Sequence, residues 1–183
     1  MREIDIISLE DGRSADLRLL NVADAHKLFY YLTHLSEESR SRFGPHPFDQ
    51  DTIVNICLQP QTDTIRYVAE NNNRIIAYML IKKGMIDTDR LRYLEKNISF
   101  DESSTATFAP SVADDFQNSG LGTKLFKTIA RNLKVSGFNT IVLWGGVQAL
   151  NTRAVHFYTK QGFLPKGSFW FDGKDNLDMV KPL

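Results

Sequence analysis

The stretch from Val112 to Leu125 holds the residues best placed to do chemistry, because two glycines stand there at the start of a helix. Before it, Thr105 to Val112 has the pattern of a strand, and after it apolar residues recur every four positions, at Leu121, Leu125, Ile129 and Leu133. Between strand and helix, the small and polar residues from Gln117 to Thr123 can turn their backbone N–H groups towards one point. Because a helix N-terminus has unpaired donors and a positive dipole end, this turn predicts a site for phosphate or pyrophosphate. We call residues Gln117 to Thr123 the cradle.

Two commoner phosphate-binding turns do not fit the cradle. The Walker loop needs Gly-Lys followed by Ser or Thr, whereas the order here is Gly122, Thr123, Lys124. The dinucleotide fingerprint needs a third small residue three positions after the second glycine, and that position is Leu125. A plain strand-to-helix turn, which uses Gly120 and Gly122 only for tight backbone geometry, remains the alternative.

A second stretch, Asn151 to Phe163, has the sequence Asn-Thr-Arg-Ala-Val-His-Phe-Tyr-Thr-Lys-Gln-Gly-Phe. Together the two stretches resemble the GCN5-related N-acetyltransferases (GNAT), which bind acyl-CoA through Gln/Arg-x-x-Gly-x-Gly/Ala. In that family the motif is followed by Asn-x-x-Ala-x-x-Phe-Tyr-x-x-x-Gly-Phe. Both patterns occur here in order, with a strand-like segment between them. The resemblance extends over nearly the whole chain, with Met85 to Ser104 as the main exception.

The resemblance implies a fold, a cosubstrate and a set of contacts. It implies a mixed α/β fold with a mostly antiparallel central sheet of about seven strands, flanked by helices, in which a splayed parallel strand pair binds the acyl-CoA. The cosubstrate would be acetyl-CoA, and no metal is implied. The implied coenzyme contacts are Ser111, Val112, Ala113, Gln117, Asn118, Ser119, Gly120, Leu121, Gly122, Thr123 and Asn151, with Lys124, Arg153 or Lys160 for the 3′-phosphate.

Acyl transfer to an amine also needs an acid and a base. By the resemblance, Tyr158 approaches the sulfur, and a phenol with a pKa near ~10 can protonate a thiolate whose conjugate acid has a pKa near ~8.5. Protein-acetylating relatives often carry a base, Glu, on the strand before the cradle, but Thr107 stands there. Glu70 is the foremost remaining base, and the other candidates are Glu102, Asp114 and His156. The missing Glu favours a small amine acceptor or a proton relayed by water.

The segment from Arg40 to Phe48 contains two prolines and a glycine, which predicts an irregular loop. In the resembled family the connection after the first helix borders the acceptor pocket. Arg42, Phe43 and His46 are therefore expected to contact the substrate, together with Phe48. The alternative is a turn stiffened by proline and packed by aromatic rings.

Composition limits the partners. The chain has 183 residues, of which 42% are apolar, so it suits one domain spanning residues 1–183. Basic and acidic residues number 22 each, which gives no general attraction to nucleic acid or membrane. The lone Cys57 cannot form an internal disulfide, and the sequence has no signal-peptide pattern or membrane-spanning run. We expect a cytoplasmic monomer or homodimer.

The remaining elements follow from periodicity and turn residues. Before the insert, the prediction is a hairpin of Ile4 to Leu9 and Ala15 to Leu20 around Asp11-Gly12, a helix capped by Asp24 and ending near residues 36–39, and a short helix from Asp51 to Leu58. A mid-sheet hairpin of Ile65 to Glu70 and Arg74 to Lys83 then turns at Asn71 to Asn73. After the cradle helix we expect a buried strand from Phe138 to Trp144 parallel to the cradle strand, a helix capped by Asn151 or Thr152, and a closing hairpin of Lys166 to Phe171 and Leu177 to Lys181.

Two questions stay open at this level. Met85 to Ser104 is too long for an ordinary structureless loop, so it is an insert that serves as a lid, a subunit contact or decoration, with one or two helical turns near Leu91 to Leu94. The chain itself is either an acyl-CoA-dependent N-acetyltransferase acting on a small or peptide amine, or a non-catalytic acyl-CoA-binding sensor or interaction domain of the same fold. Tyr158 favours the enzyme.

Overall fold

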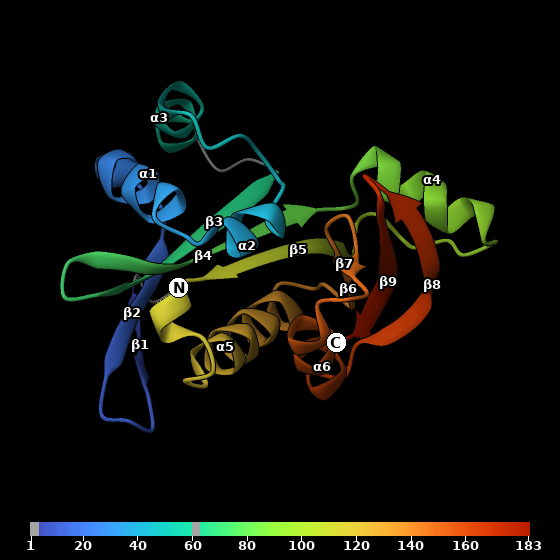
Figure 1. The fold of residues 1–183 in the computed structure, drawn as a ribbon. Helices are drawn as coiled ribbons and strands as arrows, with labels where there is room; N and C mark the ends of the chain where they lie inside the picture. The colour runs from blue at the N-terminus through green and yellow to red at the C-terminus, as the bar shows by residue number, and fades with distance from the viewer. Residues whose placement is uncertain (1–3, 60–62) are drawn as a thin grey trace. The chain divides into compact units, whose positions relative to one another are not determined.

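A computed structural model of the protein describes residues 4–59 and 63–183. Its elements, in chain order, are β1 (Ile4–Ser8), β2 (Ser14–Leu19), the 3₁₀ turn η1 (Val22–Asp24), α1 (Ala25–Thr33), α2 (Glu37–Ser41), α3 (Gln50–Leu58), β3 (Thr64–Asn71), β4 (Arg74–Lys83), α4 (Asp87–Glu95), β5 (Thr105–Val112), the 3₁₀ turn η2 (Asp114–Phe116), α5 (Leu121–Val135), β6 (Thr140–Leu143), β7 (Val147–Gln148), α6 (Thr152–Lys160), β8 (Leu164–Phe171) and β9 (Lys174–Pro182), most of which are labelled in Figure 1.

The strands form a mixed sheet in the order β1-β2-β3-β4-β5-β6-β9-β7, with β8 paired to β9. Neighbouring strands are largely antiparallel, and β5 and β6 form the parallel pair. The expected fold class is therefore confirmed. Within residues 4–59 and 63–183 the sheet has nine strands rather than about seven, and the two-residue β7 has no signal in the sequence.

Contacts along the chain divide it into two compact units. The first comprises Met1–Leu80 and Ala109–Phe126, and the second comprises Ile81–Phe108 and Lys127–Leu183. Strands β4 and β5 and helix α5 contribute residues to both units. We describe the cradle within the first unit, and the second stretch of the family pattern within the second.

The hairpins of the first unit form where turn residues predict them. Strands β1 and β2 pair from Ile4 with Arg18 to Ser8 with Ser14, and Gly12 adopts a φ of 84° in their turn. Asn72 and Asn73 turn β3 into β4 with φ values of 48° and 64°, which asparagine tolerates better than most residues. The central position predicted for these two strands is also confirmed.

Asp24 stands at the predicted N-cap position of α1, but its side chain makes no capping hydrogen bond. Asn21 caps η1 instead, by accepting the Ala23 N–H at 2.9 Å, and α1 follows directly. The side chain of Asp24 accepts the Asn21 N–H at 2.9 Å and pairs with Arg18 at 2.7 Å, so it makes no cap bond to α1. The ion pair and the capping box use both carboxylate oxygens.

Residues 36–39 also differ from the prediction of a helix end. Ser36 caps the separate short helix α2, since its side chain accepts the Ser39 N–H at 3.2 Å. Glu37 and Glu38 then occupy the first turn, where the helix dipole favours negative charge. The irregular loop therefore begins at Arg42 rather than at Arg40.

The insert packs into the core of the second unit. Helix α4 is longer than the one or two turns expected, and its Tyr93 is buried with Met85, Val142 and Val180. Arg92 and Lys96 reach Asp178 on β9 at 2.8 and 2.6 Å. The insert is thus tied to β9 by apolar contact and by charge, and α4 lies beside β8 and β9 in Figure 1.

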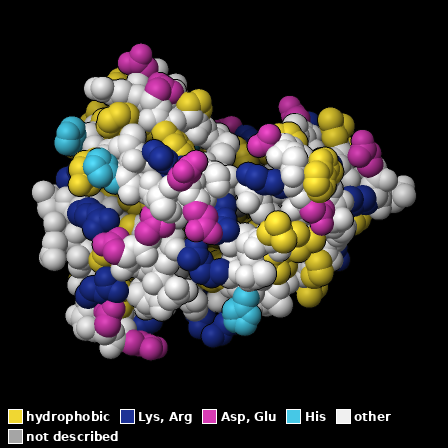
Figure 2. All heavy atoms as spheres, viewed as in Figure 1, with side chains coloured by type: hydrophobic (Ala, Val, Ile, Leu, Met, Phe, Trp, Pro, Cys, Tyr) yellow, Lys and Arg dark blue, Asp and Glu magenta, His cyan; other side chains and the backbone are white. Residues whose placement is uncertain are grey.

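The surface carries mixed charge. On the face drawn in Figure 2, Lys and Arg side chains are interspersed with Asp and Glu, in keeping with 22 residues of each sign in the chain. Among the described residues, no helix has both the length and the apolar composition needed to cross a bilayer.

Candidate functional site

The cradle has the backbone geometry of an anion-binding turn. Asn118 and Gly120 adopt positive φ angles of 61° and 80°, which reverse the chain between η2 and α5. A Cβ built on Gly120 meets no atom within 4 Å, so the turn faces open space at this position. The first turn of α5 begins at Leu121, and its N–H groups lack acceptors inside the helix.

Side chains of the cradle fold back and brace the turn. The Ser119 hydroxyl donates to the Phe116 carbonyl at 2.6 Å and accepts the Leu121 N–H at 3.4 Å. Gln117 Nε2 donates to the Val112 carbonyl at 3.1 Å. These side chains therefore support the backbone, and the backbone remains the part of the cradle that can meet a ligand.

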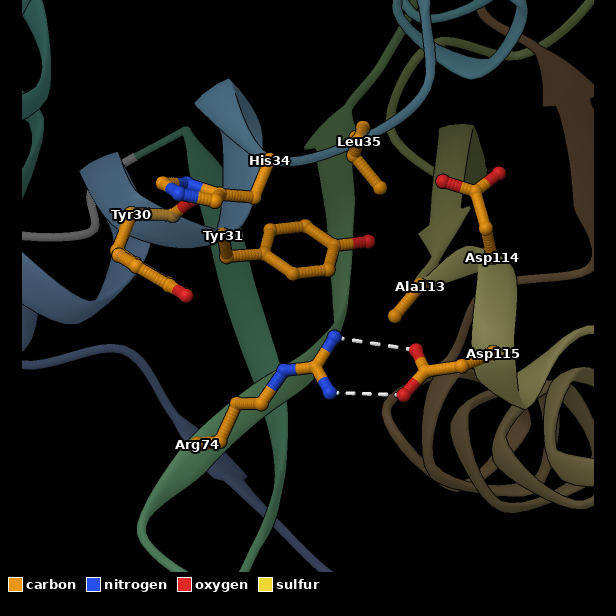
Figure 3. Close-up of a pocket in the computed structure, with 8 residues that line it drawn as sticks. All are labelled: Tyr30, Tyr31, His34, Leu35, Arg74, Ala113, Asp114 and Asp115. Atoms are coloured by element: carbon orange, nitrogen blue, oxygen red, sulfur yellow. Dashed lines mark hydrogen bonds and ion pairs between the residues drawn. The ribbon is translucent and has the colours of Figure 1, made fainter.

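Two aspartates anchor η2 immediately before the cradle. Arg74 donates to both carboxylate oxygens of Asp115, at 2.8 and 3.0 Å, and Figure 3 shows this paired contact. The Asp114 carboxylate accepts the Ser36 N–H at 2.8 Å and the Ser39 hydroxyl at 2.6 Å. Strand β4 and helix α2 thereby fix the turn that positions the cradle.

A pocket of about 240 Å³ opens beside these contacts. Its lining comes from the end of α1, the start of β4 and the turn η2, and consists of Tyr30, Tyr31, His34, Leu35, Arg74, Ala113, Asp114 and Asp115. Within it, the Tyr30 and His34 rings stack with centroids 3.7 Å apart. Because neighbouring side chains already bond to Asp114 and Asp115, neither carboxylate of the pocket is fully available to a ligand.

Some of the polar groups at the strand end proposed to bind pantetheine already make hydrogen bonds within the protein. The Ala113 N–H donates to the Ile76 carbonyl of β4 at 2.8 Å, and the Ser111 hydroxyl is bonded to the Tyr31 hydroxyl at 2.8 Å. Because successive N–H groups of a strand point to opposite edges, the Val112 N–H points away from β4. Of the three expected residues, Val112 is the one whose N–H lies at the outer edge.

In the second unit the parallel pair is short. Thr105 to Phe108 pair with Thr140 to Leu143, and the last bond runs from the Trp144 N–H to the Phe108 carbonyl at 3.0 Å. Gly145 and Gly146 then follow with φ values of 65° and 68°, which turn the chain after β6. A Cβ on Gly146 would lie 2.7 Å from the Leu177 carbonyl oxygen, so only glycine fits. The pairing of β6 with β5 therefore ends while β5 continues for four residues.

Helix α6 carries Asn151 and Tyr158. The Asn151 side chain accepts the Ala154 N–H at 3.2 Å, which confirms the predicted cap. Tyr158 is buried, with its ring centroid 5.2 Å from those of Phe157 and Phe163. Burial raises the pKa of Tyr158, so its phenol stays protonated at neutral pH. Lys160 is exposed at the last turn of the helix.

The geometry does not favour Glu70 as the base. Its carboxylate pairs with Arg18 at 2.5 Å and with Lys27 at 2.9 Å. Burial raises the pKa of Glu70, but the hydrogen bonds from Lys27 and Arg18 outweigh burial and hold the pKa below its usual value. A carboxylate held by two cations is a weak proton acceptor, so the local contacts indicate a structural role.

The other candidate bases are also engaged or exposed. Glu102 accepts the Met85 N–H at 2.7 Å, and Asp114 holds α2 as described above. His156 is exposed on α6. The buried Thr107, at the position where relatives carry Glu, donates its hydroxyl to the Gly84 carbonyl at 2.8 Å. None of these contacts identifies a base.

The acceptor-side loop brings two of its three expected residues together. Phe43 is buried, and its ring centroid lies 6.1 Å from that of His46, 6.2 Å from that of Phe48 and 5.9 Å from that of Tyr78. Arg42 is instead paired with Glu38 at 2.6 Å, one helical turn earlier. We call Phe43, His46, Phe48 and Tyr78 the aromatic cluster.

Several residues of the site had no clear signal in the sequence. Tyr78 lies in a uniformly apolar strand, and only the fold brings it to the loop. The ion pair of Arg74 and Asp115 joins residues 41 positions apart. The positive φ of Asn118 is the exception, because asparagine before a glycine turn is itself a signal for this conformation. Among the described residues, no group of three or more His, Cys, Asp or Glu side chains is arranged to hold a metal ion.

Comparisons with solved structures support this assignment of fold. The GNAT domain of PAT from S. lividans matches with a TM-score of 0.78 at 20% identity, covering 98% of this chain and 97% of that one. PaiA N-acetyltransferase from Thermoplasma acidophilum, solved with coenzyme A, matches with a TM-score of 0.65 at 16% identity and coverages of 92% and 99%. Ribosomal-protein-S18-alanine N-acetyltransferase from Escherichia coli gives a TM-score of 0.63 at 19% identity and coverages of 92% and 93%.

The search of curated protein sequences returned no significant match. A family model does match, over residues 29–163, which is most of the chain and includes both the cradle and the Asn151 to Phe163 stretch. The chain belongs to the acetyltransferase (GNAT) family.

Proposed function

We propose that this protein transfers an acetyl group from acetyl-CoA directly to a primary amine of a small molecule or peptide. The observation that carries the proposal is the cradle, in which left-handed Asn118 and Gly120 precede the first turn of α5 and leave open space at Gly120. Such a turn favours a doubly charged pyrophosphate through N–H donors and the helix dipole. We further propose that residues 1–183 act as one domain, because the family match includes segments of both units.

The cradle and the end of β5 would hold the coenzyme in the first unit. The backbone N–H groups from Asn118 to Thr123 would bind the pyrophosphate, while Ser119 and Gln117 brace them from behind. The outward N–H of Val112 would bind the pantetheine. Orientation of the thioester by such contacts accounts for a large share of the rate in well-aligned acyl transfers.

Helix α6 would supply the acid. Tyr158 stays protonated because burial raises its pKa, so it can donate a proton to the thiolate as the C–S bond breaks. Asn151, which already caps α6 through its oxygen, would use its amide nitrogen towards the pantetheine. Lys160 would pair with the 3′-phosphate.

The acceptor is proposed to bind at the aromatic cluster. A protein amine is an acceptor for one protein with this fold, since one structural neighbour is a ribosomal-protein-S18-alanine N-acetyltransferase. The retained tyrosine and its flanking motif favour catalysis over a sensor that only binds acyl-CoA. A panel of amines, with release of the coenzyme A thiol as the signal, distinguishes the two functions.

Replacing Gly120 by Val tests the coenzyme site. The variant places a branched side chain where the pyrophosphate would approach, and the positive φ at position 120 strains the backbone of any residue other than glycine. Gly137→Val is a matched control, because Gly137 also has a positive φ, 91°, and open space at its Cβ. We expect calorimetry to show loss of CoA binding in Gly120→Val and normal binding in Gly137→Val. Unchanged CoA affinity in a folded Gly120→Val protein would contradict the proposal.

A further inference from the structure

Two buried polar atoms in the aromatic cluster make no hydrogen bond of ordinary length and angle to another described residue, although the guanidinium of Arg66 lies near the second of them. They are Nε2 of His46 and the hydroxyl of Tyr78, and the two rings lie with centroids 5.8 Å apart. Tyr78 is fully buried. A buried polar group without a partner is destabilising, so a pair of them in one cluster calls for a functional explanation.

The contacts of His46 fix which ring nitrogen carries its proton. Nδ1 lies 2.7 Å from the Pro47 carbonyl oxygen, which can only accept a hydrogen bond. In the neutral ring the proton must therefore sit on Nδ1, and Nε2 has an unshared lone pair. The bond to Pro47 thus orients the ring, and its basic nitrogen is buried.

The surroundings of His46 keep the ring neutral. Burial lowers the pKa of His46, and the positive charge of Arg66 lowers it further, while the bond to Pro47 and the charge of Asp49 act in the opposite direction. At neutral pH the lone pair of Nε2 is therefore present rather than protonated. This contrasts with Glu70, whose carboxylate is already held by two cations.

Tyr78 is close to the strand end proposed to bind the coenzyme. It stands two residues along β4 from Ile76, whose carbonyl accepts the Ala113 N–H of the first unit. Ser111 stands two residues from Ala113 on β5, and its hydroxyl contacts Tyr31. The aromatic cluster is therefore near the Ser111 to Ala113 segment within the same unit.

We propose that Nε2 of His46 is the base that takes a proton from the acceptor ammonium, and that the Tyr78 hydroxyl positions the same nitrogen. This inference rests on the proposed transferase function and supplies the base that the sequence leaves unassigned. Because Nε2 is covered in the described structure, the loop from Arg42 to Phe48 must shift when the acceptor enters. Catalytic hydrogen bonds commonly form only in the substrate complex.

The proton and electron balance is complete with the groups named. One proton passes from the ammonium to Nε2, and the freed nitrogen lone pair forms the N–C bond to the acetyl carbonyl. The C–S bond breaks, its electron pair stays on sulfur, and the thiolate takes a proton from Tyr158. The amine nitrogen loses a second proton as the amide forms, and a proton from solvent restores the phenol of Tyr158. His46 releases the proton that it took to solvent.

The test is His46→Asn, because the asparagine amide can still donate to the Pro47 carbonyl but offers no basic nitrogen. His26→Asn is the control, since His26 is exposed on α1 and lies outside both the aromatic cluster and the pocket lining. Steady-state kinetics would use the best primary amine from the panel and, in parallel, hydroxylamine. Hydroxylamine is largely unprotonated at neutral pH and needs no base.

We expect His46→Asn to lower kcat/KM for the primary amine by ~10²–10⁴-fold at pH 7, while hydroxylamine turnover and CoA affinity change little. The loss should shrink as rising pH deprotonates the amine. Tyr78→Phe should raise the KM for the amine by about threefold to tenfold. His26→Asn should match the wild type in every measurement.

Three results would overturn the inference. One is a wild-type kcat/KM for the primary amine in His46→Asn, and another is an equal loss with both acceptors, which would indicate a structural role. A third is an Nε2–H tautomer in the ¹⁵N spectrum of histidine-labelled wild-type protein. If the wild type releases no coenzyme A thiol with any amine, the transferase function itself fails, and the base assignment fails with it.

Discussion

Nη2 of Arg18 donates a 2.5 Å hydrogen bond to Oε2 of Glu70, and this contact joins β2 to β3 across 52 residues of sequence. The other carboxylate oxygen of Glu70 accepts from Lys27 on α1 at 2.9 Å, and Arg18 also holds Asp24. One acidic side chain therefore links two strands and a helix. This explains why a residue that looks available for catalysis in the sequence is engaged in the fold.

Glu70→Gln should destabilise the protein by about 1.5–3 kcal/mol, because hydrogen bonds to a charged, half-buried group are lost or weakened. Chemical denaturation measures this change. Glu38→Gln removes a carboxylate from an exposed pair with Arg42 and should have little effect. Unaltered stability in Glu70→Gln would show that the network contributes nothing.

The same network predicts how stability depends on pH. The pKa of Glu70 is lower in the folded state than in the unfolded chain, so the folded state binds its proton less readily. Its contribution is therefore present above the unfolded pKa of about 4.3 and is lost as the pH falls through the folded pKa. The stability difference between wild type and Glu70→Gln should narrow below about pH 4.3. A difference that stays constant down to pH 3 would contradict this linkage.

Tyr158→Phe should keep the fold and the CoA affinity, because the ring continues to pack between Phe157 and Phe163. It should lower kcat by ~10²–10⁴-fold if the hydroxyl protonates the thiolate. Tyr30→Phe, which removes an exposed hydroxyl, is the control. Single-turnover measurements should be used so that product release does not mask the chemical step, and a wild-type rate there would exclude the general-acid role.

Phe43→Leu should raise the KM for the amine acceptor without changing CoA binding, because Phe43 contacts every other ring of the aromatic cluster. Leucine keeps much of the buried apolar volume, so the fold should tolerate the change. Isothermal titration with CoA provides the independent measurement. Weakened CoA binding with normal amine kinetics would move the acceptor site away from this loop.

Asp178→Asn should destabilise the protein by about 1.5–3 kcal/mol, because it removes the buried carboxylate that pairs with Lys96 and that shares Arg92 with Asp89. Asp175→Asn, at an exposed position of the same strand, is the matched control. Thermal unfolding of both variants measures the difference. Equal melting temperatures would mean that the insert is held by apolar packing alone.

Local signals in the sequence predicted the local features of this fold. Asn72 and Asn73 gave the β3–β4 turn, Asn151 gave the cap of α6, and Gly120 marked the start of α5, because each depends on a few neighbouring residues. Asp24 takes the predicted N-cap position, but its side chain makes no capping bond because Arg18, which comes from a separate strand, and the Asn21 N–H use its carboxylate. A side chain with two possible partners cannot be assigned without the fold.

The candidate site likewise contains features that the local sequence predicts and features that only the fold creates. The cradle and the α6 motif are contiguous in sequence and were found there, whereas Tyr78 and the contact of Arg74 with Asp115 depend on strand pairing. His46 was predicted as a substrate contact, but its tautomer depends on the backbone conformation of Pro47. The identity of the base was therefore beyond reach of the sequence alone.

The attachment of α4 to β9 matters for anyone who builds chimeras from members of this family. Asp89 accepts the Gly145 N–H at 2.9 Å, and Arg92 places its guanidinium over the Phe169 ring at 3.7 Å, in addition to its pair with Asp178. A segment of about this length looks like a module that can be exchanged on its own. If it were transplanted without Asp178 and Phe169, Lys96 would lose its carboxylate partner and Arg92 would keep only Asp89, so the helix and the C-terminal hairpin have to be exchanged together.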